Sequence, residues 1–375
     1  MKILHVITGL GNGGAESTLY KICKYDHGNE HIVISITRGG KYHSMLKKIG
    51  IKVYCINLKF YSILKFIYFI KLFRLIKPDI LQTWLILGDL LGGVGGRLAG
   101  IKNIVWNIHH SKLVVGTTKL RNIFFISVLA KLSYLIPKYI VVVSKNGIKN
   151  CKNLGYCKKK LCFIPNGYEL SVFNHNKNQE LYLKKIMKIK KKIPLIGTVS
   201  RYDPIKDHIN LLNALSFVKL KKIDFLCILI GHDVDNNNKV LVNEINRLQL
   251  NNHVKLLGSK NNIPQIMNSL DIHVLSSISE AFPNVIVEAM ACKTPCIATD
   301  VGDCRYIIGK TGWVVPPKNS LKLAYVIEKA LSQIDSINWN RRRNLARLRI
   351  EENFDISKML ESFNKLWARI YLDKN

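Results

Sequence analysis

Short apolar segments of strand length alternate with helical stretches through most of this 375-residue chain. The alternation predicts parallel β-sheets covered by helices on both faces, because each parallel strand is reached through a crossover connection. Two such series occur. The first has strand candidates at 3–8, 31–37, 52–56, 80–83, 104–108 and 140–144, and the second has them at 195–200, 225–231, 254–257, 272–276 and 296–299.

A turn-rich and then lysine-rich segment separates the two series, and we place the interdomain linker there, around 165–192. The length of the chain also favours two domains. We therefore predict an α/β protein with two Rossmann-like, doubly wound parallel-sheet domains. The first covers 1–168, the second covers 190–354, and a C-terminal helix at 355–375 packs back on the first.

Basic residues outnumber acidic ones by 57 to 25, which gives a net charge of +32. Such a field attracts nucleic acid, anionic lipid or phosphorylated substrates, although a codon bias toward lysine explains the same excess. Two stretches, 60–76 and 120–136, combine aromatic residues, leucine and lysine. Cations interrupt the first of them, so a bilayer span is disfavoured. They fit helices that dock on anionic lipid, or ordinary helices that cover a sheet.

Nine cysteines are present, and the N-terminal sequence MKILHVIT has no pattern of a secretory signal. Neither the cluster Cys151, Cys157 and Cys162 nor the pair Cys292 and Cys296 has the spacing of a C-x2-C zinc site. We expect free, buried thiols and a reducing cytoplasm.

The segment SEAFPNVIVEAMA, 279–291, places two carboxylates on either side of a helix start. Pro283 suits the beginning of a helix, so Glu280 lies on the entering loop and Glu288 about one turn inside. Carboxylates accept hydrogen bonds from hydroxyls, and the free N–H groups at a helix N-terminus attract an anion. A nucleotide diphosphate sugar has hydroxyls at both ends and an anion between them.

Arg201 and Lys206 lie on the loop that follows the first strand of the second series, in RYDPIKDH. Ligands bind at this carboxyl edge of an open parallel sheet, so the two cations can clamp a diphosphate. Solvated surface charge is the alternative in so basic a chain. His109 and His110 follow the strand at 104–108, where one of them could contact a transferred sugar or an acceptor hydroxyl, although a lone histidine is more often structural.

Two further patterns are less specific. Gly9, Gly11 and Gly14 satisfy G-x-G-x-x-G after a strand, which is a dinucleotide fingerprint. The strand at 31–37 does not end in the acid that such a site needs, yet Arg38 could meet a 2′-phosphate, so an NADP enzyme stays open. Asp233 and Asp235 form a D-x-D pair that could hold a divalent metal. We interpret it as a decoy, because the loop is rich in asparagine and the cationic pair already supplies positive charge.

Together these motifs resemble the family-4 retaining glycosyltransferases with the GT-B fold, in which two Rossmann-like domains face a cleft. The resemblance covers nearly the whole chain and is strongest over 194–317. Glu280 and Glu288 match the family's E-x7-E signature, and Arg201 and Lys206 match its arginine–lysine motif. The glycine loop stands as GGAE at 13–16 and the hinge turn as IPNG at 164–167, with TGWVVPP following at 311–317.

The resemblance implies a retaining hexosyltransferase that uses a nucleotide-diphosphate sugar, expected to be a UDP-sugar, and no metal or other cofactor. Glu288 would hold the ribose hydroxyls, and Glu280 the hydroxyls of the donor sugar. Arg201 and Lys206 would bind the diphosphate and stabilise the leaving charge. The remaining implied donor contacts are Gly13, Gly14, Phe282, Pro283, Asn284 and Val285, the last two through their backbone amides.

The family's catalytic histidine maps to His110 or His109, and His110 is preferred because Ser111 follows it. The chain departs from the family at Asp207, where glycine is common, and at GHDV, 231–234, where GDGP is common. The second departure puts contacts from that loop to the base or diphosphate in doubt.

The expected acceptor is a hydroxyl of a lipid-linked oligosaccharide or of a lipopolysaccharide or capsule glycan. We expect a cytoplasmic enzyme that lies on the anionic inner face of the cell membrane and binds no nucleic acid. Two alternatives stay open. One is a sugar-nucleotide epimerase or NADP oxidoreductase on a related fold, and the other is a non-catalytic protein that binds polyanions or membranes.

Overall fold

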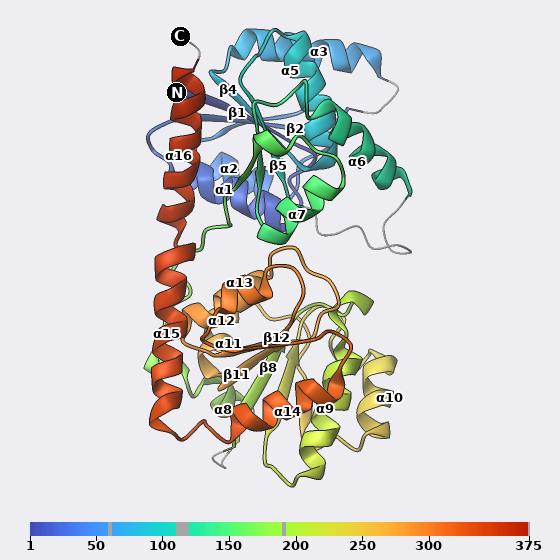
Figure 1. Ribbon diagram of the computed structural model, residues 1–375, viewed down its shortest axis with the longest axis vertical. Coiled ribbons are helices and arrows are strands. Elements are labelled where there is room, and N and C mark those ends of the chain that lie inside the picture. Colours follow the sequence, from blue (N-terminus) through green and yellow to red (C-terminus); the bar gives the residue numbers. More distant parts are fainter. Residues whose placement is uncertain (59–61, 110–119, 190–192, 374–375) are drawn as a thin grey trace. The chain divides into compact units, whose positions relative to one another are not determined.

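The computed structural model describes residues 1–58, 62–109, 120–189 and 193–373 (Figure 1). The chain divides into two compact units. Unit 1 comprises Met1–Gly167 together with Ile356–Asn375, and unit 2 comprises Tyr168–Asp355.

Within the described residues, unit 1 is built on a sheet of seven strands in the order β3-β2-β1-β4-β5-β6-β7, and every neighbouring pair is parallel. The first six follow the order of a dinucleotide-binding fold, and a seventh strand extends one edge. The strands are β1 (Lys2–Ile7), β2 (Glu30–Ser35), β3 (Lys52–Cys55), β4 (Ile80–Trp84), β5 (Ile104–Ile108), β6 (Tyr139–Val142) and β7 (Leu161–Phe163).

Alternate residues of β1 supply the cores on the two faces of this sheet. Leu4 and Val6 belong to one apolar cluster, and Ile3 and Ile7 belong to the other. A strand that is buried on both faces needs a nearly continuous apolar run, and after Lys2 only the buried His5 interrupts it in KILHVI. The helices are α1 (Gly14–Tyr25), α2 (Lys41–Lys48), α3 (Ile63–Ile76), α4 (Leu85–Leu87), the π-helix η1 (Gly88–Gly92), α5 (Gly93–Leu98), α6 (Leu120–Leu132), α7 (Lys145–Asn153), η2 (Lys158–Lys160) and α16 (Ile356–Leu372).

The last helix, α16, returns to unit 1 and runs along it (red in Figure 1). Its buried residues are three or four positions apart and therefore form one face: Met359, Phe363, Trp367 and Ile370. The indole Nε1 of Trp367 donates to Oε1 of Gln82 in β4 at 2.8 Å. The C-terminal segment thus completes the core of the first unit.

A chain of hydrogen bonds crosses the core of unit 1. Trp84 Nε1 lies 3.2 Å from His5 Nδ1, His5 Nε2 lies 2.9 Å from His31 Nδ1, and His31 Nε2 lies 3.2 Å from Asp26 Oδ2. One set of tautomers satisfies all three contacts, with the indole, His5 and His31 donating in turn. Burial lowers the pKa of His5, which keeps the ring neutral. Although burial acts in the opposite direction, the hydrogen bond from His31 lowers the pKa of Asp26 to about 2.

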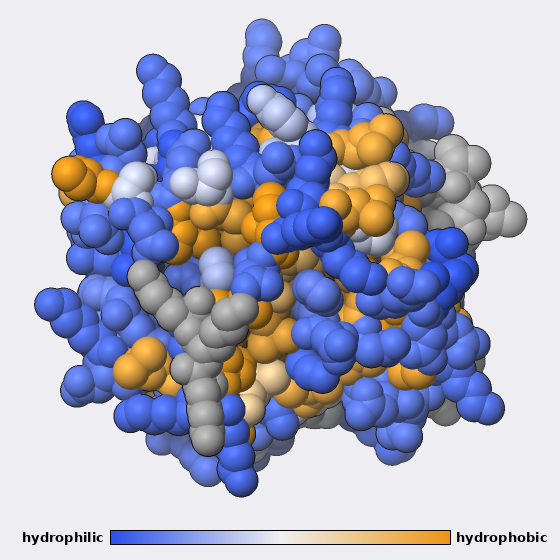
Figure 2. Space-filling view, turned by 90° about the horizontal axis from the view of Figure 1, so that it is seen from below, coloured by the Kyte–Doolittle hydropathy of each residue, from blue (hydrophilic) through white to orange (hydrophobic). Residues whose placement is uncertain are grey.

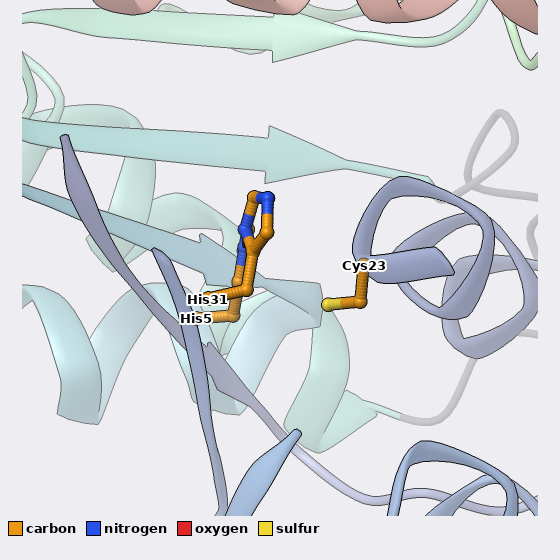
Figure 3. Close-up of side chains that lie close together, drawn as sticks. All are labelled: His5, Cys23 and His31. Atoms are coloured by element: carbon orange, nitrogen blue, oxygen red, sulfur yellow. Dashed lines mark hydrogen bonds between the residues drawn. The ribbon is translucent and has the colours of Figure 1, made fainter. Parts of the chain in front are cut away.

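The sulfur of Cys23 points toward the two imidazole rings from α1 (Figure 3). Among the described residues, His5, Cys23 and His31 are the one set of three potential metal ligands that lies close enough together. The nitrogens that face each other between the two rings already share a hydrogen bond, and burial raises the pKa of the Cys23 thiol. A metal ion would have to break the inter-ring hydrogen bond, so the arrangement is that of a structural network.

Unit 2 repeats the same topology. Its described residues form a six-stranded sheet in the order β10-β9-β8-β11-β12-β13, with every pair parallel. The strands are β8 (Leu195–Val199), β9 (Leu226–Ile230), β10 (Val254–Leu256), β11 (Ile272–Leu275), β12 (Cys296–Thr299) and β13 (Trp313–Val315). The helices are η3 (Lys177–Gln179), α8 (Tyr182–Ile186), η4 (Pro204–Lys206), α9 (His208–Leu220), α10 (Lys239–Arg247), α11 (Ile263–Ser269), α12 (Asn284–Ala291), α13 (Cys304–Ile308), α14 (Ser320–Leu331) and α15 (Ile337–Phe354).

The prediction of an interdomain linker over 165–192 is wrong for residues 168–189, because these residues belong to unit 2. Leu183 of α8 is fully buried, and its backbone N–H donates to Ser269 Oγ at 3.2 Å. Asn268 Nδ2 donates to the carbonyl oxygen of Asn174 at 2.9 Å. One buried leucine among many lysines leaves little apolar periodicity, so this packing has no signature in the sequence. The second unit therefore begins at Tyr168 and not at 190.

Hydrophilic residues predominate on the face of the molecule shown in Figure 2, and apolar residues gather in patches between them. No helix in the described part of the chain has both the length and the apolar character required to cross a membrane.

Candidate active site

The candidate site lies at the carboxyl edge of the unit 2 sheet. β8 and β11 are neighbours there. From β8 the chain continues to β9 on one side, and from β11 it continues to β12 on the other, so the strand order reverses between them. Ligands bind open α/β sheets at such a reversal of strand order. The loop after β8 carries Arg201 and Lys206, and the loop after β11 carries Glu280. The topology thus brings together two motifs that are far apart in the sequence.

Lys206 and Glu280 form an ion pair, with 2.5 Å between Nζ and Oε1. Their side chains are only 19% and 13% exposed, so solvent screens the pair less than a surface salt bridge. Ser277 Oγ donates a second hydrogen bond to the same carboxylate oxygen at 2.7 Å. The ammonium group is therefore held in one place, where an anionic ligand could take over part of the role of Glu280.

Backbone hydrogen bonds join the two loops. The N–H of Ile278 donates to the carbonyl oxygen of Ile205 at 2.8 Å, and Ser276 Oγ donates to the carbonyl oxygen of Lys206 at 2.9 Å. Gly302, at φ 52°, packs against the carbonyl oxygens of Glu280 and Ala281. A side chain at Gly302 would displace the Glu280 loop, so the loop position depends on this glycine.

The two departures from the family pattern occur where the backbone is left-handed. Asp207 has φ 49°, and its carboxylate accepts a hydrogen bond from the N–H of Asn210 at 3.3 Å, capping α9. Asp233 has φ 58°. Aspartate tolerates this conformation better than most residues that have a side chain. Both aspartates therefore preserve the backbone shape that glycine would provide.

Arg201 is not brought into the Lys206–Glu280 pair. Its guanidinium contacts Asp203 Oδ2 from Nη2 at 2.8 Å and from Nε at 3.2 Å, and its side chain is 65% exposed. Although burial opposes the change, the Ile205 amide and the Arg201 guanidinium lower the pKa of Asp203. In this structure Arg201 is thus neutralised by its neighbour, and it would have to leave Asp203 to bind a diphosphate.

His208 is a buried residue of the site region that the sequence motifs did not single out. Its Nε2 lies 3.1 Å from Ser200 Oγ at the end of β8. Burial, reinforced by the nearby charge of Lys206, lowers the pKa of His208 to about 4. A neutral imidazole therefore links the first residue of α9 to the end of β8, on either side of the loop that carries the two cations.

The helix α12 begins at Asn284, and Pro283 occupies the position just before it. The expected helix start is confirmed to within one residue, and Glu288 lies one turn into the helix on the same side as Asn284. The amides of Asn284 and Val285 are in the first turn, where N–H groups have no acceptor within the helix. Phe282 and Pro283 are both buried, and the ring of Phe282 lies 5.7 Å from that of Phe354. Both side chains are thus withdrawn from solvent, and that of Phe282 packs against Phe354 of the same unit.

Tyr168 is a second residue that the sequence did not point to. Its hydroxyl donates to Asn284 Oδ1 at 2.5 Å, and its ring stacks on Phe282 with 6.4 Å between centroids. Burial, reinforced by the charge of Glu288, raises the pKa of Tyr168, so the hydroxyl stays protonated and keeps donating. Tyr168 thereby orients the side chain at the N-terminus of α12 from a position 116 residues away.

In unit 1, Gly13 precedes α1 and Gly14 is the first residue of that helix. The carboxylate of Glu16 lies directly against Gly13, at the position where a Cβ would be. The helix N-terminus therefore already faces an anion of the chain itself. This arrangement disfavours the interpretation of the glycine loop as a dinucleotide diphosphate site.

His109 lies at the end of β5, with its ring 5.5 Å from that of Trp84. His110, the preferred histidine, lies outside the described residues. Asp233 and Asp235 each have a local partner. Asp233 Oδ2 lies 3.0 Å from His232 Nδ1, and Asp235 Oδ1 accepts from the N–H of Asn237 at 2.8 Å. Both carboxylates are used in the local turn.

Two family descriptions match the chain, and together they span both units. Residues 12–172 match Glycosyltransferase Family 4, and residues 174–347 match Glycosyl transferases group 1. HepE from Anabaena, crystallised in complex with UDP, superimposes with a TM-score of 0.87 at 21% identity, over 98% of this chain and 100% of that chain. A glycosyltransferase from Rickettsia africae gives a TM-score of 0.82 at 24% identity, over 98% of each chain.

Characterised relatives align over shorter stretches. The UDP-Gal:α-D-GlcNAc-diphosphoundecaprenol α-1,3-galactosyltransferase of Escherichia coli is 26% identical, over 62% of this chain and 61% of that protein. The N,N'-diacetylbacillosaminyl-diphospho-undecaprenol α-1,3-N-acetylgalactosaminyltransferase of Campylobacter jejuni is 26% identical, over 65% of this chain and 64% of that protein. The aligned part is thus less than two thirds of each relative. The two family matches and the two-unit fold agree: the chain belongs to the family-4, group 1 glycosyltransferases and has the GT-B fold.

Proposed function

We propose that this protein transfers a sugar from a nucleotide diphosphate, with UDP as the nucleotide, to a hydroxyl of a lipid-linked or polysaccharide glycan. The observation that carries the proposal is the Lys206–Glu280 pair beside the N-terminus of α12, which also carries Glu288. The pair supplies one cation and one hydrogen-bond acceptor, and the helix adds free N–H groups and a second acceptor. This set matches the sugar, the diphosphate and the ribose of one ligand.

Each residue has a distinct role in this proposal. Glu280 accepts hydrogen bonds from the donor sugar, and Glu288 accepts them from the ribose. Lys206, with Arg201 once it leaves Asp203, stabilises charge on the departing diphosphate, and the amides of Asn284 and Val285 add to this electrostatic effect. The reaction needs no metal ion, because these groups supply the positive charge. The new bond keeps the anomeric configuration of the donor, with the leaving phosphate helping to deprotonate the acceptor.

The names of relatives support the choice of substrates. The Escherichia coli and Campylobacter jejuni relatives are named for acceptors in which a sugar is joined to undecaprenol through a diphosphate. A Staphylococcus aureus relative, 22% identical over 77% of this chain, is named for capsular polysaccharide biosynthesis. HepE structures contain UDP and UDP-glucose. We infer that unit 2 binds the donor and that unit 1 binds the acceptor.

Replacing Glu288 by glutamine tests the donor site. We expect kcat/KM to fall about 10- to 150-fold, the range for losing hydrogen bonds to a charged group. A panel of UDP-sugars with a prenyl-diphospho-sugar acceptor provides the assay, and product NMR gives the anomeric configuration. Exposed Glu352 on α15 provides the matched control, Glu352→Gln, which should keep full activity. Undiminished transfer by Glu288→Gln contradicts the site, and loss of activity in EDTA contradicts a metal-free reaction.

We also propose that unit 1 lies on the inner, anionic face of the cell membrane through α3. This helix exposes a stripe of apolar residues, with Leu64 80% and Leu75 78% exposed, and it carries Lys65, Lys71 and Arg74 on its exposed surface. Apolar side chains flanked by cations suit insertion at the boundary between lipid headgroups and acyl chains.

Vesicle sedimentation tests this proposal. The full-length protein should sediment with vesicles that contain phosphatidylglycerol, and binding should weaken as salt increases. Replacing Leu64 and Leu75 by glutamate should abolish most of the binding. Leu220→Glu, at a leucine of unit 2 that is 75% exposed, is the control and should bind as the unmodified protein does. If Leu220→Glu loses as much vesicle binding as the α3 variant, α3 is not the membrane-binding surface.

A further inference from the structure

A cavity of about 300 Å³ opens at the carboxyl edge of the unit 1 sheet. Its lining includes Thr8 after β1, the short helix α4 after β4, His109 after β5, and residues of the first turns of α6. β1 and β4 are the neighbours at which the strand order of this sheet reverses. The cavity therefore occupies the place in unit 1 where open α/β sheets bind ligands.

The two sides of the cavity differ in chemistry. Leu85–Leu87 and Phe125 make an apolar wall. Arg121 and Asn122 contribute polar groups, and His109 borders the same space. A guanidinium group binds phosphate oxygens in pairs, and none of the described residues that line the cavity is a carboxylate that could neutralise it. The site thus offers contacts for an apolar chain, for a phosphorylated group and for a hydroxyl, all within one small volume.

The backbone beneath the apolar wall is under strain. Leu85 has φ 67°, in the left-handed region that residues with side chains rarely adopt. The π-helix η1 follows α4 directly. Left-handed residues with side chains and single π-helical turns both concentrate at ligand sites, where the fold holds them in place. The left-handed residue lies where β4 passes into α4, whose three residues form the apolar side of the cavity.

We propose that this cavity receives the prenyl diphosphate end of a lipid-linked acceptor. The first part of the prenyl chain lies against Leu85–Leu87 and Phe125, the diphosphate binds Arg121, and the attached sugar lies beside His109. A volume of about 300 Å³ is at the lower end of the range for small-molecule sites, so it holds the head of such a lipid and a short part of its chain. The inference rests on the proposed function and assigns it a definite acceptor site.

Isothermal titration calorimetry of the full-length protein with farnesyl diphosphate, below its micelle concentration, tests the assignment without any turnover. We expect saturable binding at one site. Inorganic diphosphate and farnesol should each bind at least about tenfold more weakly, because each lacks one of the two sets of contacts. Phe125→Ala and Arg121→Gln should each weaken farnesyl diphosphate binding about tenfold or more.

Neighbouring residues provide matched controls. Phe124 is next to Phe125 on α6 but is 65% exposed and does not line the cavity, so Phe124→Ala should leave the Kd within about twofold. Lys131→Gln removes an exposed cation from the same helix and should have equally little effect. If Phe124→Ala weakens binding as much as Phe125→Ala, the lipid adsorbs to the surface of the helix and the proposal fails.

UDP titrations separate this inference from the proposed function. Phe125→Ala and Arg121→Gln should bind UDP as the unmodified protein does, because the groups assigned to the donor are in unit 2. Loss of UDP affinity in these two variants would assign the cavity to the donor and overturn the inference, as would absence of saturable farnesyl diphosphate binding. Failure of Glu288→Gln to lower activity would instead overturn the donor site and leave the lipid titration standing.

Discussion

Replacing Lys206 by methionine is expected to lower kcat about 100- to 1,000-fold, the range for removing one group that stabilises charge in a transition state. Methionine keeps most of the length of the side chain but cannot neutralise a departing diphosphate. Steady-state kinetics with the best UDP-sugar measures the effect. Lys322→Met, at an exposed lysine on α14, is the control and should retain full activity.

The same substitution should also lower stability, because Glu280 is only 13% exposed and would lose its cation. The double variant Lys206→Met/Glu280→Gln removes both charges, so it should regain stability but not activity. Comparing melting temperatures and kcat for the single and double variants separates the structural role of the pair from its catalytic role. A double variant that regains activity would show that Lys206 serves only to neutralise Glu280.

Replacing Trp367 by alanine is expected to destabilise unit 1 by about 3–5 kcal/mol, the usual loss when a large buried aromatic residue is truncated. Trp367 is completely buried, and its ring lies 5.4 Å from Phe363 and 5.9 Å from His31. The change would also remove the hydrogen bond to Gln82 in the middle of the sheet. A loss of this size is a large part of the total stability of a typical domain.

Hydrogen exchange followed by mass spectrometry measures the effect of Trp367→Ala unit by unit, which a single unfolding curve of a two-domain protein does not do. Amides of β1 and β4 should lose protection, and amides of β8 and β11 should change much less. Leu372→Ala, at a residue of the same helix that is 68% exposed, is the control and should change the free energy of unfolding by less than about 0.5 kcal/mol. If the amides of β4 are equally protected from exchange in Trp367→Ala and in the control, the packing of α16 does not stabilise the sheet of unit 1.

The local pattern of the sequence determined most of the elements and placed the candidate motifs at the carboxyl ends of their strands. All eleven strand candidates are strands of the structure, and the helix that follows Pro283 begins within one residue of its expected start. Buried parallel strands need continuous apolar runs, so each strand leaves its mark within a few residues. Among the described residues, β7 and β13 are the strands that were missed. Each has three residues and adjoins a turn motif, IPNG after β7 and the prolines of TGWVVPP after β13, so the turn signals obscured the short apolar run.

The tertiary structure alone decided which distant residues meet. It paired Lys206 with Glu280 across 74 positions, left Arg201 on Asp203, and brought Tyr168 to Asn284 across 116 positions. It also moved the start of the second unit to Tyr168 and gave Trp367 a partner 285 residues away. Apolar periodicity is a property of neighbours in the chain, whereas these contacts depend on strand order and side-chain packing, which join residues regardless of their separation in sequence.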